Sequence, residues 1–239
     1  MQDSPLTDLT AATISSSEPH RIRSFIRRQG RITAAQAKAL EDLWPAYGLA
    51  PDQRLDAPTI FGRVAPLVLE IGFGNGDSLA TMAAENPACD YIGIEVHRPG
   101  VGHLLLKIEA QGVGNVRVYC ADAIDILTHC VADASLDRLQ LFFPDPWHKK
   151  RHNKRRIVNA EFLALVCRKL KPGGIFHAAT DWEPYAEHMA ETLATCPALQ
   201  SLTADSPFSP RPDYRPLTKF ESRGQRLGHG VWDLLYRRD

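Results

Sequence analysis

The chain alternates short, almost entirely apolar runs with longer segments in which apolar residues recur every three or four positions. Apolar runs bounded by glycine or proline predict buried strands of a parallel sheet, and the longer segments predict helices. The predicted strands span 67–71, 91–96, 116–120, 136–143 and 175–179. The predicted helices that follow them span 78–84, 101–111, 123–129, 157–170 and 183–195. This alternation indicates an α/β fold with a mostly parallel sheet and helices on both faces.

The C-terminal part of the chain departs from the alternation. Residues 198–204 and 231–237 predict two further strands, which we expect to form an antiparallel pair at the edge of the sheet. A proline-rich loop from 206 to 230 separates them. A loop of that length within a compact domain is either functional or disordered.

The N-terminal part is less regular. Thr33 predicts the cap of a short helix through 34–44, which Pro45 is expected to stop. The first twenty residues are rich in Ser and Thr and predict a disordered tail. The expected organisation is a tail (1–20), a basic arm with a short helix and a linker (21–62), and one domain (63–239).

The composition sets limits on the class of protein. With 239 residues, 44% of them hydrophobic, the chain can bury one sizeable core. No uncharged apolar run could span a bilayer and no basic-then-apolar signal segment begins the chain, so we expect a soluble, cytoplasmic protein without membrane contact. The five scattered cysteines contain no C-x-x-C pair, which predicts reduced thiols. No His or Cys cluster has metal-ligand spacing, so we expect no bound metal.

A glycine-rich turn follows the first strand. The sequence from 67 to 77 is L-V-L-E-I-G-F-G-N-G-D, with glycines at Gly72, Gly74 and Gly76. Glycines at the end of a buried strand let the backbone approach a nucleotide cofactor. A dinucleotide fingerprint requires G-x-G-x-x-G, but Asp77 stands where its third glycine would be. Glu70 would repel a pyrophosphate but suits the sulfonium and ammonium of S-adenosylmethionine; a glycine turn without a ligand is the alternative.

Each of the first five predicted strands ends at or near an acidic residue. These residues are Glu70, Glu95, Asp122, Asp145 and Asp181. The carboxyl ends of parallel strands form the ligand-binding edge of an α/β sheet. Glu95 is placed to accept from ribose hydroxyls, and Asp122 from an adenine amino group. Helix capping explains Asp122 and Asp181 equally well, but it explains five acids on one rim less readily.

Basic residues gather in two segments, although the 28 basic and 28 acidic residues of the whole chain balance. Six of the eight residues from Lys149 to Arg156 are basic, and the segment 21–31 carries five arginines. The first cluster directly follows Pro144-Asp145-Pro146-Trp147, a turn stiffened by two prolines. A polyanion bound there would lie at the catalytic rim, which favours nucleic acid as the large substrate. A solvated charge run is the alternative, and Trp147 is either a stacking platform or a core aromatic.

The chain resembles the bacterial tRNA (guanine-N(7)-)-methyltransferases. The matching motifs are R-S-F-I-R-R-Q-G-R-I-T, L-E-I-G-F-G-N-G-D, Y-I-G-I-E-V-H-R-P-G-V-G, F-P-D-P-W-H-K-K-R-H-N-K-R-R, L-K-P-G-G, A-T-D-W and T-K-F-E-S-R-G-Q-R-L-G-H-G. They span roughly 23 to 237. The resemblance implies a Rossmann-like class I S-adenosylmethionine-dependent methyltransferase fold with a seven-stranded sheet. It also implies methyl transfer to N7 of a guanine in the tRNA variable loop, expected at position 46.

The resemblance assigns roles to individual residues. The cofactor would be held by Glu70, Gly72, Gly74, Gly76, Glu95, Asp122 and Asp145, with Asp145 also the catalytic residue. The substrate would contact Lys149, Asp181, Thr218, Lys219, Phe220 and Glu221. The RNA would contact Arg151, His152, Asn153, Lys154, Arg155 and Arg156. These roles imply tRNA as the partner, with no obligatory protein partner and a monomer or weak homodimer.

Other functions fit the same patterns. A nicotinamide-dependent oxidoreductase would share the fold class, but the glycine spacing and Glu70 disfavour it. A methyltransferase of another RNA or of protein would use the same cofactor site. A non-catalytic RNA-binding module would keep the basic cluster but would not need the acidic rim.

Overall fold

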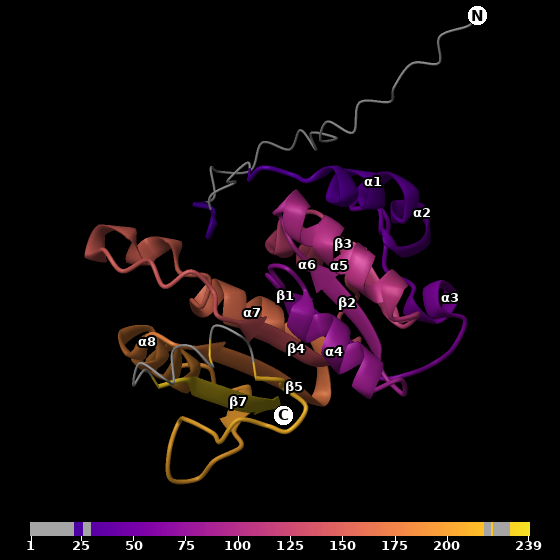
Figure 1. The fold of residues 1–239 in the computed structure, drawn as a ribbon. Helices are drawn as coiled ribbons and strands as arrows, with labels where there is room; N and C mark the ends of the chain where they lie inside the picture. Colours follow the sequence, from indigo (N-terminus) through magenta and orange to yellow (C-terminus); the bar gives the residue numbers. More distant parts are fainter. Residues whose placement is uncertain (1–21, 26–29, 218–220, 222–229) are drawn as a thin grey trace, which may run out of the picture.

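The computed structural model describes residues 22–25, 30–217, 221 and 230–239 (Figure 1). The predicted tail and the site residues Thr218, Lys219 and Phe220 lie outside these ranges. Within the described part of the chain, no helix is long and apolar enough to cross a membrane. The division of the chain at residue 62 stays a prediction.

The described residues form a seven-stranded sheet in the order β3-β2-β1-β4-β5-β7-β6. Its strands are β1 (Leu67–Ile71), β2 (Asp90–Ile94), β3 (Val116–Tyr119), β4 (Leu136–Phe142), β5 (Leu170–Thr180), β6 (Leu199–Ser201) and β7 (Trp232–Arg238). Strands β1 to β5 are parallel, whereas β7 runs antiparallel to both β5 and β6. The prediction of a mostly parallel sheet that ends in an antiparallel pair is confirmed.

Helices cover both faces of the sheet (Figure 1). They are α1 (Ala34–Asp42), α2 (Trp44–Tyr47), α3 (Ala57–Phe61), α4 (Asp77–Glu85), α5 (Arg98–Ala110), α6 (Ala123–His129), the 3-10 helix η1 (Lys150–Arg155), α7 (Ala160–Lys169) and α8 (Glu183–Ala194). Buried residues of α1, α4 and α5 form the core on one face. Buried residues of α6, α7 and α8 form the core on the other.

Local sequence accounts for several helix ends. Thr33 caps α1 as predicted, in a capping box with Gln36. Pro45 does not stop the N-terminal helical region; it lies in the first turn of α2, where a missing N–H costs nothing. The helix predicted from residue 157 begins at Ala160, because the Asn159 side chain accepts a hydrogen bond from the Phe162 N–H at 3.0 Å.

The fifth strand is longer than predicted. The predicted strand spans 175–179, but Pro172, Gly173 and Gly174, which precede it, also lie within β5. The pairing register shifts between Leu136 and Arg138 of β4, and Gly173 has φ +80°. An irregularity of this kind lets a strand continue through residues that otherwise end one.

The chain order reverses between β1 and β4. From β1 the sheet continues through β2 to β3 on one side and through β4 to β5 on the other. The helices that follow β1 and β4 therefore diverge and leave a crevice at the carboxyl ends of these two strands. Ligands of open α/β sheets bind at such a switch point.

Candidate active site

The glycine turn after β1 adopts a conformation that requires glycine. Gly72, Gly74 and Gly76 have φ of +72°, +60° and +75°, in the left-handed region that other residues rarely adopt. Gly76 is the N-cap of α4, and a Cβ there would lie 2.7 Å from the Leu104 side chain. The predicted role of these glycines in shaping the turn thus has a direct structural basis.

Glu95 ties the glycine turn to the end of β2. Its Oε2 accepts a hydrogen bond from the Gly74 N–H at 2.9 Å. Its Oε1 accepts from the N–H groups of Val96 and His97 at 2.6 and 2.9 Å. Three backbone donors hold this carboxylate in one orientation, at the mouth of the crevice.

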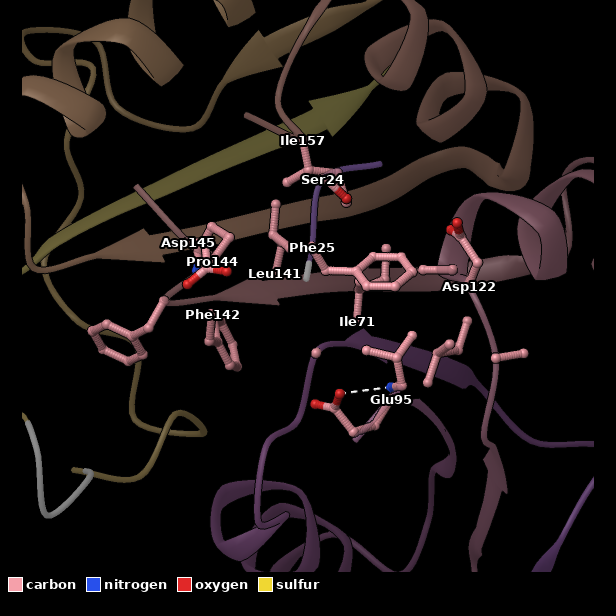
Figure 2. A pocket seen from close by; sticks show the side chains of 16 residues that line it. Ser24, Phe25, Ile71, Glu95, Asp122, Leu141, Phe142, Pro144, Asp145 and Ile157 are labelled. Carbon is pink, nitrogen blue, oxygen red and sulfur yellow. Dashed lines mark hydrogen bonds between the residues drawn. The ribbon is translucent and has the colours of Figure 1, made fainter. Parts of the chain in front are cut away.

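A cavity of about 230 Å³ occupies the crevice (Figure 2). Three acids predicted for the rim line it, namely Glu95, Asp122 and Asp145. Its other lining residues are Ser24, Phe25, Ile71, Gly72, Ile94, Val96, Ala121, Ala123, Leu141, Phe142, Phe143, Pro144 and Ile157. Within the described part of the chain, no Lys or Arg lines it. The cavity is therefore apolar with an acidic rim.

Asp122 and Asp145 differ in their surroundings. Asp122 is buried and caps α6, accepting from the Ile124 N–H at 3.0 Å. The capping explanation for Asp122 is therefore correct, yet its carboxylate also faces the cavity. Asp145 is exposed and lies on the other side of the cavity, with Phe25 between the two (Figure 2).

Glu70 lies beneath the glycine turn instead of lining the cavity. It is fully enclosed in β1, and within the described residues its Oε2 has no hydrogen-bond partner. Burial, with a smaller contribution from the nearby charge of Glu95, raises the pKa of Glu70 from 4.5 to about 8. A cation that approached it would favour the ionised form and relieve this penalty.

The turn from Phe143 to Trp147 is held on both sides. Phe143 and Trp147 have φ of +50° and +48°, which is unusual for residues other than glycine. The Trp147 indole N–H donates to the Ser24 carbonyl at 3.1 Å, and the Arg156 guanidinium donates to the Pro146 carbonyl at 3.0 Å. Trp147 thus joins the N-terminal arm to the turn that carries the catalytic candidate.

The predicted RNA-contacting residues from Arg151 to Arg155 lie in η1, directly after this turn, and Arg156 is its C-cap. Lys149, Arg151 and Lys154 are exposed, whereas His152, Asn153 and Arg155 are half-buried. Arg155 stacks over the Trp147 ring at 5.0 Å. Arg156 is only 8% exposed, with its guanidinium over the Tyr185 ring at 4.8 Å. The sequence grouped these residues together, but the structure gives Arg156 a supporting position.

The predicted substrate-contacting residues Asp181 and Glu221 also have different surroundings. Asp181 is exposed at the carboxyl end of β5, outside the cavity lining. Glu221 is 2% exposed, and its two oxygens accept from the Arg215 guanidinium at 2.7 Å each. Arg215 also donates twice to Asp233 of β7, at 2.7 and 2.8 Å.

Three residues at or near the site were not predicted as site residues from the sequence. Ser24 and Phe25 line the cavity although the arginines around them suggested only a basic arm. Arg215 lies in a proline-rich loop, where a buried arginine has no periodic pattern to reveal it. The R-S-F-I-R-R motif was the one available clue to Ser24 and Phe25.

Comparison with known proteins gives the family. A family model described as "Putative methyltransferase" matches residues 64–234. A tRNA (guanine-N(7)-)-methyltransferase from Methylococcus capsulatus is 57% identical over 230 residues, covering 96% of this chain and 100% of that protein. Another, from Alcanivorax borkumensis, is 60% identical over 219 residues, covering 91% of this chain and 92% of that protein.

Solved structures extend the comparison to the fold. The 16S rRNA methyltransferase KamB matches with a TM-score of 0.54 at 17% identity, covering 92% of this chain and 99% of that chain. At that identity the likeness concerns the fold alone, which is that of the class I methyltransferases. The sequence relatives carry the narrower assignment, because they match this chain over nearly its whole length. The chain belongs to the family of the tRNA (guanine-N(7)-)-methyltransferases.

Proposed function

We propose that this protein transfers a methyl group from S-adenosylmethionine to N7 of a guanine in tRNA, in the variable loop. The observation that carries the proposal is the acid-rimmed cavity at the switch point of the sheet. It lies beside a strained turn that leads directly into the basic helix η1. A cationic methyl donor and a polyanionic substrate would meet at this place.

The lining of the cavity suits S-adenosylmethionine. The apolar walls formed by Ile71, Ile94 and Leu141 fit a flat adenine, and Asp122 lies beside them. Glu95 would accept from the ribose hydroxyls. Glu70, whose Oε2 has no hydrogen-bond partner among the described residues, would attract the ammonium group from beneath the turn as its carboxyl ionises. A pyrophosphate would meet carboxylates and no basic side chain among the described lining residues, which disfavours a nicotinamide dinucleotide.

The chemistry makes few demands on protonation. S-adenosylmethionine supplies a methyl group on a positively charged sulfur. Guanine N7 attacks the methyl carbon with its own lone pair, the carbon–sulfur bond breaks, and its electron pair stays on sulfur. No proton has to be removed from N7 first, so the protein's task is to orient the base and to stabilise the positive charge that develops on the purine.

Asp145 is the residue placed for that task. Within the described residues, its carboxylate makes no hydrogen bond or ion pair, and it faces the cavity from the strained turn. It would accept from the guanine N1–H and amino group, as carboxylates do from paired donors. We assign Asp145 the role of orienting the base and stabilising its charge, not that of a general base.

The RNA contacts would come from the exposed basic residues. Lys149, Arg151 and Lys154 present their charges beside the Asp145 turn, where they would neutralise phosphates. Guanine N7 is covered when the base takes part in tertiary pairing, so the enzyme would flip the base or loosen the surrounding RNA. His152, Asn153 and Arg155 would contribute their exposed parts, and Arg156 would support the turn from below.

The remaining contacts complete the proposal. Lys149 and Asp181 would contact the target nucleotide, together with Thr218, Lys219 and Phe220 of the C-terminal loop. Glu221, paired with Arg215, would hold that loop in place instead of touching the base. We further propose that the protein acts in the cytoplasm without an obligatory protein partner, as a monomer or weak homodimer.

Methyl transfer to bulk tRNA tests the function. Purified protein is incubated with isotopically labelled S-adenosylmethionine and unmodified tRNA, and the nucleosides are then separated by mass spectrometry. We expect label in 7-methylguanosine and mapping of the modified fragment to the variable loop. Label in another nucleoside, or transfer to rRNA or protein alone, would support the other methyltransferase functions. RNA binding without transfer would support a non-catalytic module.

A further inference from the structure

Trp182 stands out at the rim of the sheet. Its side chain belongs to the few large apolar groups that are exposed, at 40%, whereas the other three tryptophans are only partly exposed. It follows Asp181 directly after β5 and occupies the cap position of α8. An exposed indole on a binding rim has an aromatic face available to a ligand.

The backbone of Trp182 is held firmly. Its N–H donates to the Thr180 hydroxyl at 3.3 Å. Its carbonyl accepts from the N–H groups of Tyr185 and Ala186 at 2.9 and 3.0 Å, in the first turn of α8. The backbone from which the indole projects is therefore held by β5 and α8.

The ring lies next to the turn that carries Asp145. The Trp182 and His148 rings meet edge to face, with centroids 4.4 Å apart at 88°. His148 is three residues beyond Asp145, and the Phe143 N–H donates to the Ala179 carbonyl at 2.8 Å, which holds the ends of β4 and β5 together. Beside this contact, Trp182 remains 40% exposed.

We propose that Trp182, steadied by His148, is the platform on which the target guanine stacks during methyl transfer. This inference rests on the proposed function. Methylation at N7 turns a neutral purine into a cation, and an indole attracts a cation more strongly than a neutral ring of the same shape. The stacking interaction therefore grows along the reaction, and Trp182 stabilises the transition state more than the bound substrate.

The two carboxylates beside the indole complete the site. Asp181 precedes Trp182 and Asp145 lies on the neighbouring turn, and both are exposed. A base stacked on Trp182 would present its edge to these acids and its face to the indole. Guanine has hydrogen-bond donors on that edge, at N1 and the amino group, whereas adenine has a donor only at its amino group.

The first test compares Trp182→Leu with Trp182→Phe. For leucine we expect kcat/KM for tRNA methylation to fall about 10- to 100-fold, the range that loss of one base–aromatic stack gives. Phenylalanine should restore most of it, and the S-adenosylmethionine Kd from calorimetry should be unchanged in both. Trp44→Phe, in α2, is the matched control and should behave like the wild type. A structural role alone would lower folding stability without this rescue by an aromatic ring.

The second test isolates the charge. 7-methylguanosine 5′-monophosphate and guanosine 5′-monophosphate are compared as inhibitors, and as quenchers of tryptophan fluorescence in the Trp44→Phe protein. We expect the methylated, cationic nucleotide to bind more tightly, and this preference to disappear in Trp182→Leu. Equal inhibition by both nucleotides, or wild-type kcat/KM in Trp182→Leu while the wild type methylates tRNA, would overturn the assignment of Trp182 alone. Absence of methylation by the wild type would overturn the proposed function as well.

Discussion

At the scale of single residues, Asp145 stands out because it projects from a turn with a strained backbone. The turn that carries it has left-handed φ values at Phe143 and Trp147, and two prolines restrict the rotation between them. Strain of this kind persists only where surrounding contacts hold it, and it concentrates at functional sites. The turn thereby fixes the backbone from which one carboxylate projects, which suits a reaction that depends on orientation.

Asp145→Asn keeps the shape of the side chain and removes its charge. We expect kcat to fall by about 10²- to 10³-fold, because preorganised electrostatic groups typically supply that much. Affinity for S-adenosylmethionine, measured by calorimetry, should stay close to that of the wild type. Asp205→Asn, an exposed acid in the C-terminal loop, is the control. Normal turnover by Asp145→Asn would show that Asp145 has no part in methyl transfer. Loss of S-adenosylmethionine binding would show that Asp145 mainly binds the cofactor.

Glu70 makes stability depend on pH in an unusual direction. Its pKa is raised to about 8 in the folded protein, mainly by burial, whereas an unfolded chain titrates it near 4.5. Between these two values the folded state holds a proton that the unfolded state releases. The contribution of this proton to folding stability is therefore fully present below pH 4.5, and it is lost as the pH rises through 8.

Glu70→Gln removes this titration while keeping the shape of the side chain. We expect the variant and the wild type to have similar stability at pH 4.5. As the pH rises towards 8, the free energy of unfolding of the variant should increase relative to that of the wild type by up to about 1.4 kcal/mol per pH unit. Urea denaturation at pH 5 and pH 8 measures the difference. Glu161→Gln, an exposed residue of α7, should show no such trend. A difference in free energy of unfolding between variant and wild type that stays constant with pH would show that Glu70 is ionised in the folded state throughout this range.

At the scale of secondary-structure elements, the elements that clear local sequence signals mark were predicted correctly. The bounds of β1 and α6 agree with the prediction, because a glycine turn follows β1 and an Asp cap begins α6. The prediction failed where tertiary pairing overrides local signals. The strand pairing of β5 with β4 carries the strand through Pro172 and Gly173, which alone would predict a turn.

The parts of the site that the sequence did not predict are contacts between distant segments. The bond from Trp147 to Ser24 joins residues 123 positions apart, and no local pattern marks it. The same holds for Phe25 in the cavity and for Arg215 between two acids. The acidic rim was predictable because parallel strands bring their carboxyl ends to one edge. Which of the acids line the cavity depended on side-chain packing.

The basic helix η1 is the element that we expect to bind the RNA phosphates. Replacing Lys150, Arg151 and Lys154 by serine removes three exposed charges. We expect weaker tRNA binding and a slope of log K against log salt that is smaller by about 2, since each lost phosphate contact removes roughly 0.7 to 0.9. Binding measured by filter retention at several salt concentrations gives the slope.

Two further variants separate charge from structure in this segment. Lys38→Ser with Arg54→Ser removes exposed charges elsewhere and should leave the slope unchanged. Arg156→Met should lower thermal stability and kcat more than it changes the slope, because Arg156 supports the Pro146 carbonyl. A triple variant of η1 with an unaltered slope would exclude this element from the RNA interface.

At the scale of the whole molecule, one face of the sheet is covered by two different kinds of structure. Over β1, β2 and β3 the described residues place α4 and α5. Over β4, β5 and β7 the cover comes from the C-terminal loop through Tyr214 and Arg215. The Tyr214 hydroxyl lies 2.9 Å from His177 Nδ1, and its ring stacks on Arg138 at 3.8 Å. This part of the face is thus covered by polar contacts of a loop instead of by a helix.

Arg215 holds this cover in place, so its loss should loosen the molecule more than the loss of a surface charge. The guanidinium is 1% exposed and pairs with both Glu221 and Asp233. Arg215→Met would remove the guanidinium that two buried carboxylates share, and we expect the free energy of unfolding to fall by about 3–5 kcal/mol. Chemical denaturation measures it, with Arg237→Met, an exposed residue of β7, as the control. Equal stability of the two variants would mean that apolar contacts hold the loop, and that the buried ion pairs add nothing to the free energy of unfolding.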